Sequence, residues 1–76
     1  MPTEIFAEYN GREIAVTVTT LLDGHFRIER IGLWSRDGHR TGYTKLTVSP
    51  NLTFATRAEA EQYGLAFAQG AIDGGA

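Results

Sequence analysis

The chain opens on two runs in which apolar and polar residues alternate, residues 3 to 9 and residues 12 to 20. Alternation with a period of two is typical of a β-strand that buries one face. Asn10-Gly11 separates the two runs, and Asn-Gly is the strongest short-range signal for a two-residue hairpin loop. The pattern therefore predicts an N-terminal β-hairpin.

A two-residue loop also fixes how these strands pair. Tyr9 would lie opposite Arg12, and Glu8 opposite Glu13, a like-charge pair that we expect to be mildly unfavourable. In this register the apolar residues of both strands share one face, whereas a slip of one residue would scatter them. The residues on the shared face are Ile5, Ala7, Ile14, Val16 and Val18.

Residues 26 to 34, which follow a turn signal at Asp23-Gly24, predict a third strand. Its apolar residues change phase midway. Phe26 and Ile28 have even numbers, whereas Ile31 and Leu33 have odd numbers, so a regular strand would turn the two pairs to opposite faces. A β-bulge near Glu29-Arg30 would turn all four toward the core. The four residues are Phe26, Ile28, Ile31 and Leu33.

A further turn signal, Asp37-Gly38, precedes a predicted fourth strand at residues 41 to 48, with Leu46 and Val48 facing inward. Ser49-Pro50-Asn51 ends that strand. Phe54 follows this break, and we expect its ring to fill the core where the chain crosses to the last element.

That last element is an amphipathic helix from Thr56 to Asp73. Thr56 and Glu59 have the spacing of a capping box, in which each side chain bonds the backbone amide of the other residue. The i, i+3, i+4 rule predicts the apolar face. It consists of Ala60, Tyr63, Gly64, Phe67 and Ala71, widened on one side by Leu65, Ala68 and Ile72.

The glycines of this helix need separate explanations. Gly64 lies in mid-helix, where glycine costs about 1 kcal/mol in propensity. We interpret it as the place where the helix backbone approaches a sheet closely, and a merely tolerated glycine is the alternative. The helix would end at Gly70 or at Gly74, either of which could adopt a left-handed cap.

The order β-β-β-β-α predicts an α+β fold, a four-stranded antiparallel meander with one C-terminal helix packed on one face. At 76 residues the chain is expected to form a single domain. The other face of the sheet would have no cover. That face would carry Glu4, Phe6, Ala15, Thr17, Arg27, Trp34, Tyr43, Lys45 and Thr47.

Composition bears on the setting of the protein. The chain has no cysteine, hence no disulfide and no thiolate site. Residues 1 to 4 lack the basic start and apolar run of a signal peptide. No apolar stretch approaches the roughly 20 residues that a membrane span needs. We therefore expect a cytoplasmic protein without membrane contact.

The net charge of −2 conceals a division along the chain. Residues 25 to 57 hold six basic residues against two acidic ones, whereas residues 1 to 24 and 58 to 76 each carry a net charge of −3. The third and fourth strands thus form a basic hairpin in an acidic protein. Its basic residues are Arg27, Arg30, Arg36, Arg40 and Lys45, followed by Arg57.

This hairpin suggests two functions from different classes. Exposed aromatic rings on the uncovered face favour a protein partner, above all a second copy of the chain. Cations beside aromatic rings also suit single-stranded nucleic acid, although a pI of about 5.5 is far from the basic values of most such binders. Pairing of the cations with acids of the same molecule is the structural alternative. The predicted binding residues are Arg27, Arg30, Trp34, Arg40, Tyr43 and Lys45.

Other chemistry has little support. His25 and His39 lie in separate turns without the spacing of a metal site. Ser35 and Ser49 lack a nucleophile-elbow context. We expect no enzyme activity, no metal and no cofactor.

The end of the chain carries a resemblance. Residues 56 to 64 read Thr-Arg-Ala-Glu-Ala-Glu-Gln-Tyr-Gly, and Ile72-Asp73 follows. With the Asn10-Gly11 and Asp23-Gly24 turns, this resembles small uncharacterised bacterial proteins in which antiparallel strands run into a "TxxEAxxxG…ID" helix. The resemblance implies the fold and a bacterial cytoplasmic setting, and it implies no active site.

Overall fold

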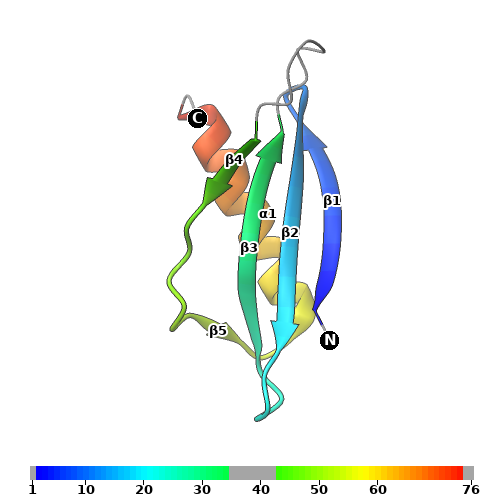
Figure 1. Cartoon of the computed structure of the whole chain (residues 1–76), viewed down its shortest axis with the longest axis vertical. Coiled ribbons are helices and arrows are strands. Elements are labelled where there is room, and N and C mark those ends of the chain that lie inside the picture. Colours follow the sequence, from blue (N-terminus) through cyan, green and yellow to red (C-terminus); the bar gives the residue numbers. More distant parts are fainter. Residues whose placement is uncertain (1, 35–42, 75–76) are drawn as a thin grey trace.

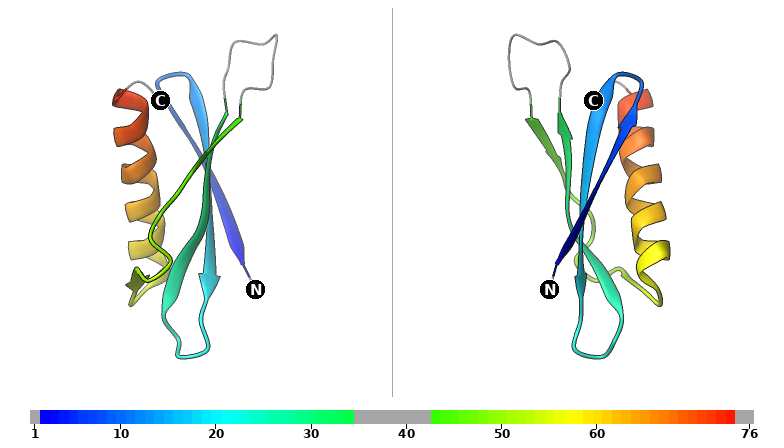
Figure 2. Two further views of the ribbon diagram at one scale, coloured as in Figure 1. Left: turned by 60° about the vertical axis from the view of Figure 1, so that its left-hand side comes forward. Right: turned by 90° about the vertical axis from the view of Figure 1, so that its right-hand side faces the viewer.

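In the described part of the chain the strands build one antiparallel sheet, and a single helix packs against one of its faces (Figures 1 and 2). The computed structural model describes residues 2–34 and 43–74. This arrangement confirms the predicted α+β class. The elements are β1 (Thr3–Tyr9), β2 (Arg12–Thr20), β3 (Phe26–Trp34), β4 (Tyr43–Leu46), β5 (Thr53–Phe54) and α1 (Arg57–Asp73).

The first hairpin has the predicted register. Tyr9 pairs with Arg12 and Glu8 pairs with Glu13. Asn10 and Gly11 have φ angles of 50° and 77°, the positive values that a two-residue loop of type I′ requires at both central positions.

The predicted bulge in β3 is also confirmed. Thr17 of β2 pairs with Arg30 and the next residue, Val18, pairs with Ile28, so Glu29 is the extra residue. The Thr19 hydroxyl donates a 2.6 Å hydrogen bond to Glu29 Oε1. The change of phase buries the apolar residues on both sides of the bulge, and these are Ile28, Ile31 and Leu33.

The outer edge of β3 is shared by two strands. β4 ends at Leu46, two residues before the predicted end at Val48, and pairs with Ile31 to Trp34. Leu46 and Val48 pack against the core as expected. β5, which was not predicted from the sequence, pairs with the beginning of β3. Phe54 of β5 packs against the core, as predicted. The turn predicted at Asp37-Gly38 lies outside the described residues.

Helix α1 begins with the predicted capping box. The Glu59 amide donates to Thr56 Oγ1 at 3.1 Å, and the Thr56 amide donates to Glu59 Oε1 at 3.3 Å. At the other end the Gly74 amide donates to the Gly70 carbonyl at 3.0 Å. Gly74 has φ −82°, so the expected left-handed cap is wrong.

The predicted core-facing side of α1 is rotated from the observed one. Ala60, Gly64 and Ala68 are the buried residues of the helix, whereas Tyr63 and Phe67 are 40% and 37% exposed. The small residues form an i, i+4 row that lets the helix axis approach the sheet. The large rings do not fit into this narrow gap and lie at its side.

Gly64 marks the closest approach of helix and sheet. A Cβ atom at this position would lie 2.7 Å from Cγ1 of Val16, which is fully buried in β2. This contact confirms that Gly64 serves the close approach rather than being merely tolerated. The core around it consists of Ile14, Val16, Val18, Ile28, Ile31, Leu33, Ala60 and Ala68.

Candidate functional site

The face of the sheet turned away from α1 is covered by no other element of the described residues, as the two views in Figure 2 show. We call this surface the open face. Strand register decides its members, because side chains alternate between the two faces and the bulge resets the phase in β3. The positions on it are Glu4, Phe6 and Glu8 of β1; Glu13, Ala15, Thr17 and Thr19 of β2; Arg27, Arg30, Gly32 and Trp34 of β3; and Lys45 of β4.

Most of the predicted binding residues have positions on this face. Arg27, Arg30 and Trp34 lie along β3, and Lys45 lies on β4 opposite Gly32. Tyr43 pairs with Trp34 through the backbone. Arg40, the remaining predicted residue, lies outside the described part of the chain, as does His39.

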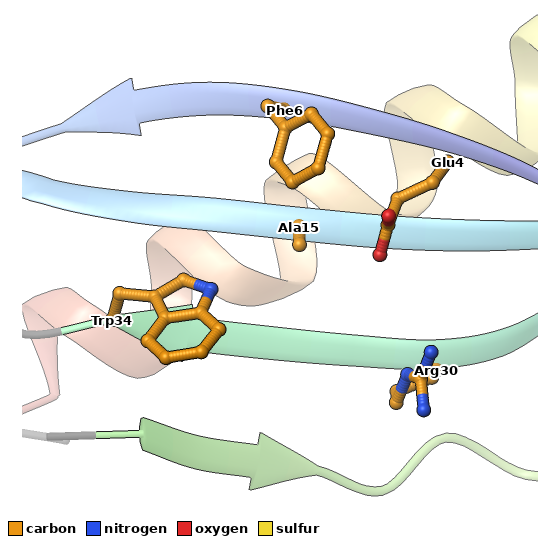
Figure 3. Close-up of a pocket in the computed structure, with 5 residues that line it drawn as sticks. All are labelled: Glu4, Phe6, Ala15, Arg30 and Trp34. Carbon is orange, nitrogen blue, oxygen red and sulfur yellow. The ribbon is translucent and has the colours of Figure 1, made fainter. Parts of the chain in front are cut away.

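A groove crosses the open face above Ala15. It has a volume of about 450 Å³ and is lined by Glu4, Phe6, Ala15, Arg30 and Trp34. Figure 3 shows the rings of Phe6 and Trp34 on the two sides of Ala15, with Glu4 and Arg30 toward the other end. Phe6 is 61% exposed, which leaves most of its ring in contact with solvent.

The groove exists because small residues meet in neighbouring strands. Ala15 of β2 pairs with Phe6 on one side and with Gly32 of β3 on the other. The side chains of Ala15 and Gly32 are only a methyl group and a hydrogen atom, so the surface is depressed there. The rings of Phe6 and Trp34 rise above this depression. The sequence analysis placed Ala15 on this face but did not predict the groove.

Charge divides the open face along the direction of the strands. The carboxylates of Glu4, Glu8 and Glu13 occupy β1 and β2, whereas the cations of Arg27, Arg30 and Lys45 occupy β3 and β4. Glu29 at the bulge is the exception on the basic half, and it is hydrogen-bonded to Thr19. The face is therefore acidic on one half and basic on the other.

The cations of the basic half have no ion pair within the described residues. No carboxylate of residues 2–34 or 43–74 lies within 4.0 Å of the charged nitrogens of Arg27, Arg30 or Lys45. Arg57 belongs to the same basic segment of the sequence but lies on the helix side of the sheet. Its guanidinium is 5.8 Å from the centre of the Phe26 ring. In the described part of the chain, nothing supports internal pairing of the open-face cations.

Glu4 and Arg30 flank the same residue of the central strand. Thr17 of β2 pairs with Glu4 on one side and with Arg30 on the other. The Thr17 side chain is buried, and its hydroxyl lies 3.4 Å from Glu4 Oε2, the length of a weak hydrogen bond. A carboxylate and a guanidinium thus stand near each other on the open face without forming an ion pair.

A second exposed aromatic surface lies beside α1. The centres of the Phe54 and Tyr63 rings are 5.3 Å apart, and those of Tyr63 and Phe67 are 6.2 Å apart. The i, i+4 spacing of Tyr63 and Phe67 could have revealed this aromatic row, but the sequence analysis placed both rings in the core.

His25 lies in the turn between β2 and β3, where it contacts Asp23. The His25 backbone amide donates to Asp23 Oδ1 at 3.0 Å, and His25 Nδ1 lies 3.3 Å from the same oxygen. The backbone hydrogen bond lowers the pKa of Asp23, and the His25 side chain contributes in the same direction. No group of three or more potential metal ligands occurs in residues 2–34 and 43–74.

The helix in the described part of the chain is neither long nor apolar enough to cross a membrane. Comparison with protein-family models, with curated proteins and with solved structures finds no match to this chain, so the resemblance to small bacterial proteins stays a prediction.

Proposed function

We propose that this protein is a small interaction module and that a second copy of the chain binds to its open face. The observation that carries the proposal is the groove between Phe6 and Trp34 on a sheet face that no described element covers. An aromatic ring exposed in a concave surface gains free energy when a partner excludes water from it. A twofold pair would cover both grooves at once.

The size of the open face indicates how strong such a pair is. Strands about 4.8 Å apart, with about seven residues rising about 3.3 Å each, give a four-stranded face of roughly 19 by 23 Å. Two such faces bury on the order of 1,000 Å² in total, the lower limit for specific interfaces. We therefore expect reversible association with a Kd on the order of 10–100 μM.

Sedimentation equilibrium between about 5 and 500 μM tests the proposal. The mass should rise from 8.3 kDa toward twice that value. Phe6→Ser should weaken association by about tenfold, because it removes the exposed ring that lines the groove. Leu22→Ser is the matched control, since Leu22 is a fully exposed apolar residue of the β2–β3 turn, away from the open face. A mass of 8.3 kDa at every concentration would refute the proposal.

Binding of single-stranded nucleic acid is the second candidate. In its favour, Arg27, Arg30 and Lys45 lie on the same half of the open face as Trp34. Against it, the other half carries three carboxylates, which repel phosphate.

The cytoplasmic location and the bacterial setting predicted from the sequence stay predictions.

Fluorescence of Trp34, the single tryptophan of the chain, separates the two candidates. The protein is titrated at low salt with a pool of random single-stranded oligonucleotides. Saturable quenching that disappears when salt is raised would favour nucleic acid, since phosphate contacts release counterions. The self-association proposal predicts a trace that does not change with added oligonucleotide.

A further inference from the structure

We infer that the twofold axis of the pair runs parallel to the strands, between β2 and β3, and that Arg30 of each copy binds Glu4 of the other. This inference rests on the proposed self-association. It adds the relative orientation of the copies and the ion pair that selects it.

The orientation follows from the division of charge on the open face. A face-to-face pair can have its axis along the strands or across them. An axis across the strands lays the acidic half of one copy over the acidic half of the other. An axis along the strands, placed midway between β2 and β3, lays β1 of each copy over β4 of its partner. Each acidic half then meets a basic half, and opposite charges across an interface select the arrangement.

Glu4 and Arg30 have the best positions for this exchange. Both flank Thr17 and lie at the same end of the groove. In the inferred pair, Arg30 lies over Thr17 of the partner, one strand away from the partner's Glu4, a distance that the long arginine side chain spans. The small Ala15 and Gly32 lie over each other at the centre, which lets the two sheets approach.

Burial also requires that these charges be paired. A carboxylate or guanidinium that loses water without gaining a partner costs several kcal/mol. Arg30 has no ion pair within the described residues. In the inferred pair, Glu4 of the other copy supplies its carboxylate. The twofold axis supplies two such pairs, because the contact is made once in each direction.

Pairing of β1 edges is the competing arrangement, since β1 forms one edge of the sheet. Two β1 strands in full antiparallel overlap would be centred on Phe6. This register sets Glu4 of each copy opposite Glu8 of the other, and like charges directly opposite are destabilising. The charge pattern thus disfavours the edge and favours the face.

Charge reversal in separate chains tests the inference. Glu4→Lys places two cations together in the homodimer, and Arg30→Glu places two carboxylates together, so each variant alone should associate more weakly by on the order of tenfold. In a mixture of the two variants, the introduced lysine of one chain meets the introduced glutamate of the other. The native Arg30 of the first chain likewise meets the native Glu4 of the second. The heterodimer should recover an affinity within about threefold of the unmodified chain.

The matched control keeps the charges and moves one of them. A mixture of Glu61→Lys with Arg30→Glu has the same net charges, but Glu61 lies on α1, away from the open face. Its heterodimer keeps one Arg30–Glu4 pair, but Glu4 of one chain meets the introduced glutamate of the other, so this mixture should recover only part of the affinity. Native mass spectrometry at low salt reports the heterodimer, and circular dichroism checks that each substitution leaves the fold intact.

The outcomes separate the inference from the proposed function. A heterodimer that is clearly tighter in the first mixture than in the control supports the axis and the ion pair. If the unmodified chain dimerises but the first mixture does not recover, the inferred orientation is wrong and self-association stands. If the unmodified chain stays a monomer at every concentration, both the inference and the proposed function are refuted.

Discussion

The Tyr9 hydroxyl donates a bifurcated hydrogen bond to the carboxylate of Asp73, at 3.1 Å to Oδ1 and 3.0 Å to Oδ2. Asn10 Nδ2 lies 3.4 Å from Oδ1 of the same carboxylate. Tyr9 ends β1 and Asp73 ends α1, so this contact fastens the tip of the first hairpin to the last turn of the helix.

The Tyr9–Asp73 contact predicts a loss of stability at high pH. The hydrogen bond to Asp73, followed by burial and the repulsive charge of that carboxylate, raises the pKa of Tyr9 above its ordinary value of 10.0. A group whose pKa is raised in the folded state stabilises the fold below its unfolded pKa, and this contribution disappears as pH rises through the folded pKa. The stability advantage of the wild type over Tyr9→Phe should therefore shrink above about pH 10.

Urea unfolding at pH 8 and pH 11 measures this difference. Tyr63→Phe is the control, since it also removes one phenolic hydroxyl, and its partner rings are aromatic. An advantage over Tyr9→Phe that stays constant between the two pH values would show that Asp73 does not govern Tyr9.

Gly64 and Gly70 form a natural pair for a test of helix packing. Gly64→Ala should destabilise the protein by about 1–2 kcal/mol, because overpacking costs about 1–3 kcal/mol and the gain in helix propensity is only about 1 kcal/mol. Gly70→Ala should stabilise it by about 0.5–1 kcal/mol, since a Cβ there meets nothing within 4 Å. Thermal or urea unfolding measures both changes.

A second substitution shows where the strain arises. A Cβ at Gly64 would clash with Val16 Cγ1 at 2.7 Å. Val16→Ala removes that atom, so Gly64→Ala should cost less in a Val16→Ala background than in the wild type. Equal costs in both backgrounds would contradict close packing at this point.

The capping box at the start of α1 predicts a loss of stability when the Thr56 hydroxyl is removed. Thr56→Ala should destabilise the protein by about 1 kcal/mol, because the Glu59 amide loses its acceptor. Thr56→Ser keeps the hydroxyl and should cost only a few tenths of a kcal/mol. Urea unfolding of both variants gives the comparison, and equal losses would mean that the methyl group rather than the cap matters.

Asp23 predicts a weakening at low pH. Its pKa is lowered in the folded state by the hydrogen bond from the His25 amide. A group whose pKa is lowered stabilises the fold above its unfolded pKa, and this contribution is lost as pH falls through the folded value. Asp23→Asn keeps an acceptor without the charge, so its stability should fall less than that of the wild type below about pH 4. Urea unfolding at pH 6 and pH 2.5 measures both, and parallel losses would contradict the assignment.

The sequence predicted the first three strands of the sheet because each left a local mark. Asn10-Gly11 set the hairpin register, and the change of parity between Ile28 and Ile31 revealed the bulge at Glu29. A two-residue strand such as β5 leaves no such mark, because two residues cannot show alternation. Its pairing with β3 depends on where the crossover brings Phe54.

Helix orientation and the groove depend on distances that no periodicity contains. Tyr63 and Phe67 fit an apolar stripe as well as Ala60 and Ala68 do, since a stripe about 100° wide does not indicate its own centre. The narrow space above Val16 determines which side of α1 faces the sheet, because only the small residues fit there. The groove likewise required Ala15 and Gly32 to be neighbours across β2 and β3, which the register settles only after the bulge is placed on a definite residue.

The position of α1 along the chain has a consequence for synthesis. The sheet strands β1 to β3 are complete at residue 34, but the helix that covers their apolar face ends only at Asp73. At about 5–20 residues per second, a ribosome needs roughly 2–8 s to add the intervening segment. Until α1 has been synthesised, the core side chains of Ile14, Val16 and Ile31 have no helix to cover them. We therefore expect β1 to β3 to become stable only with the last element of the chain, as one cooperative unit.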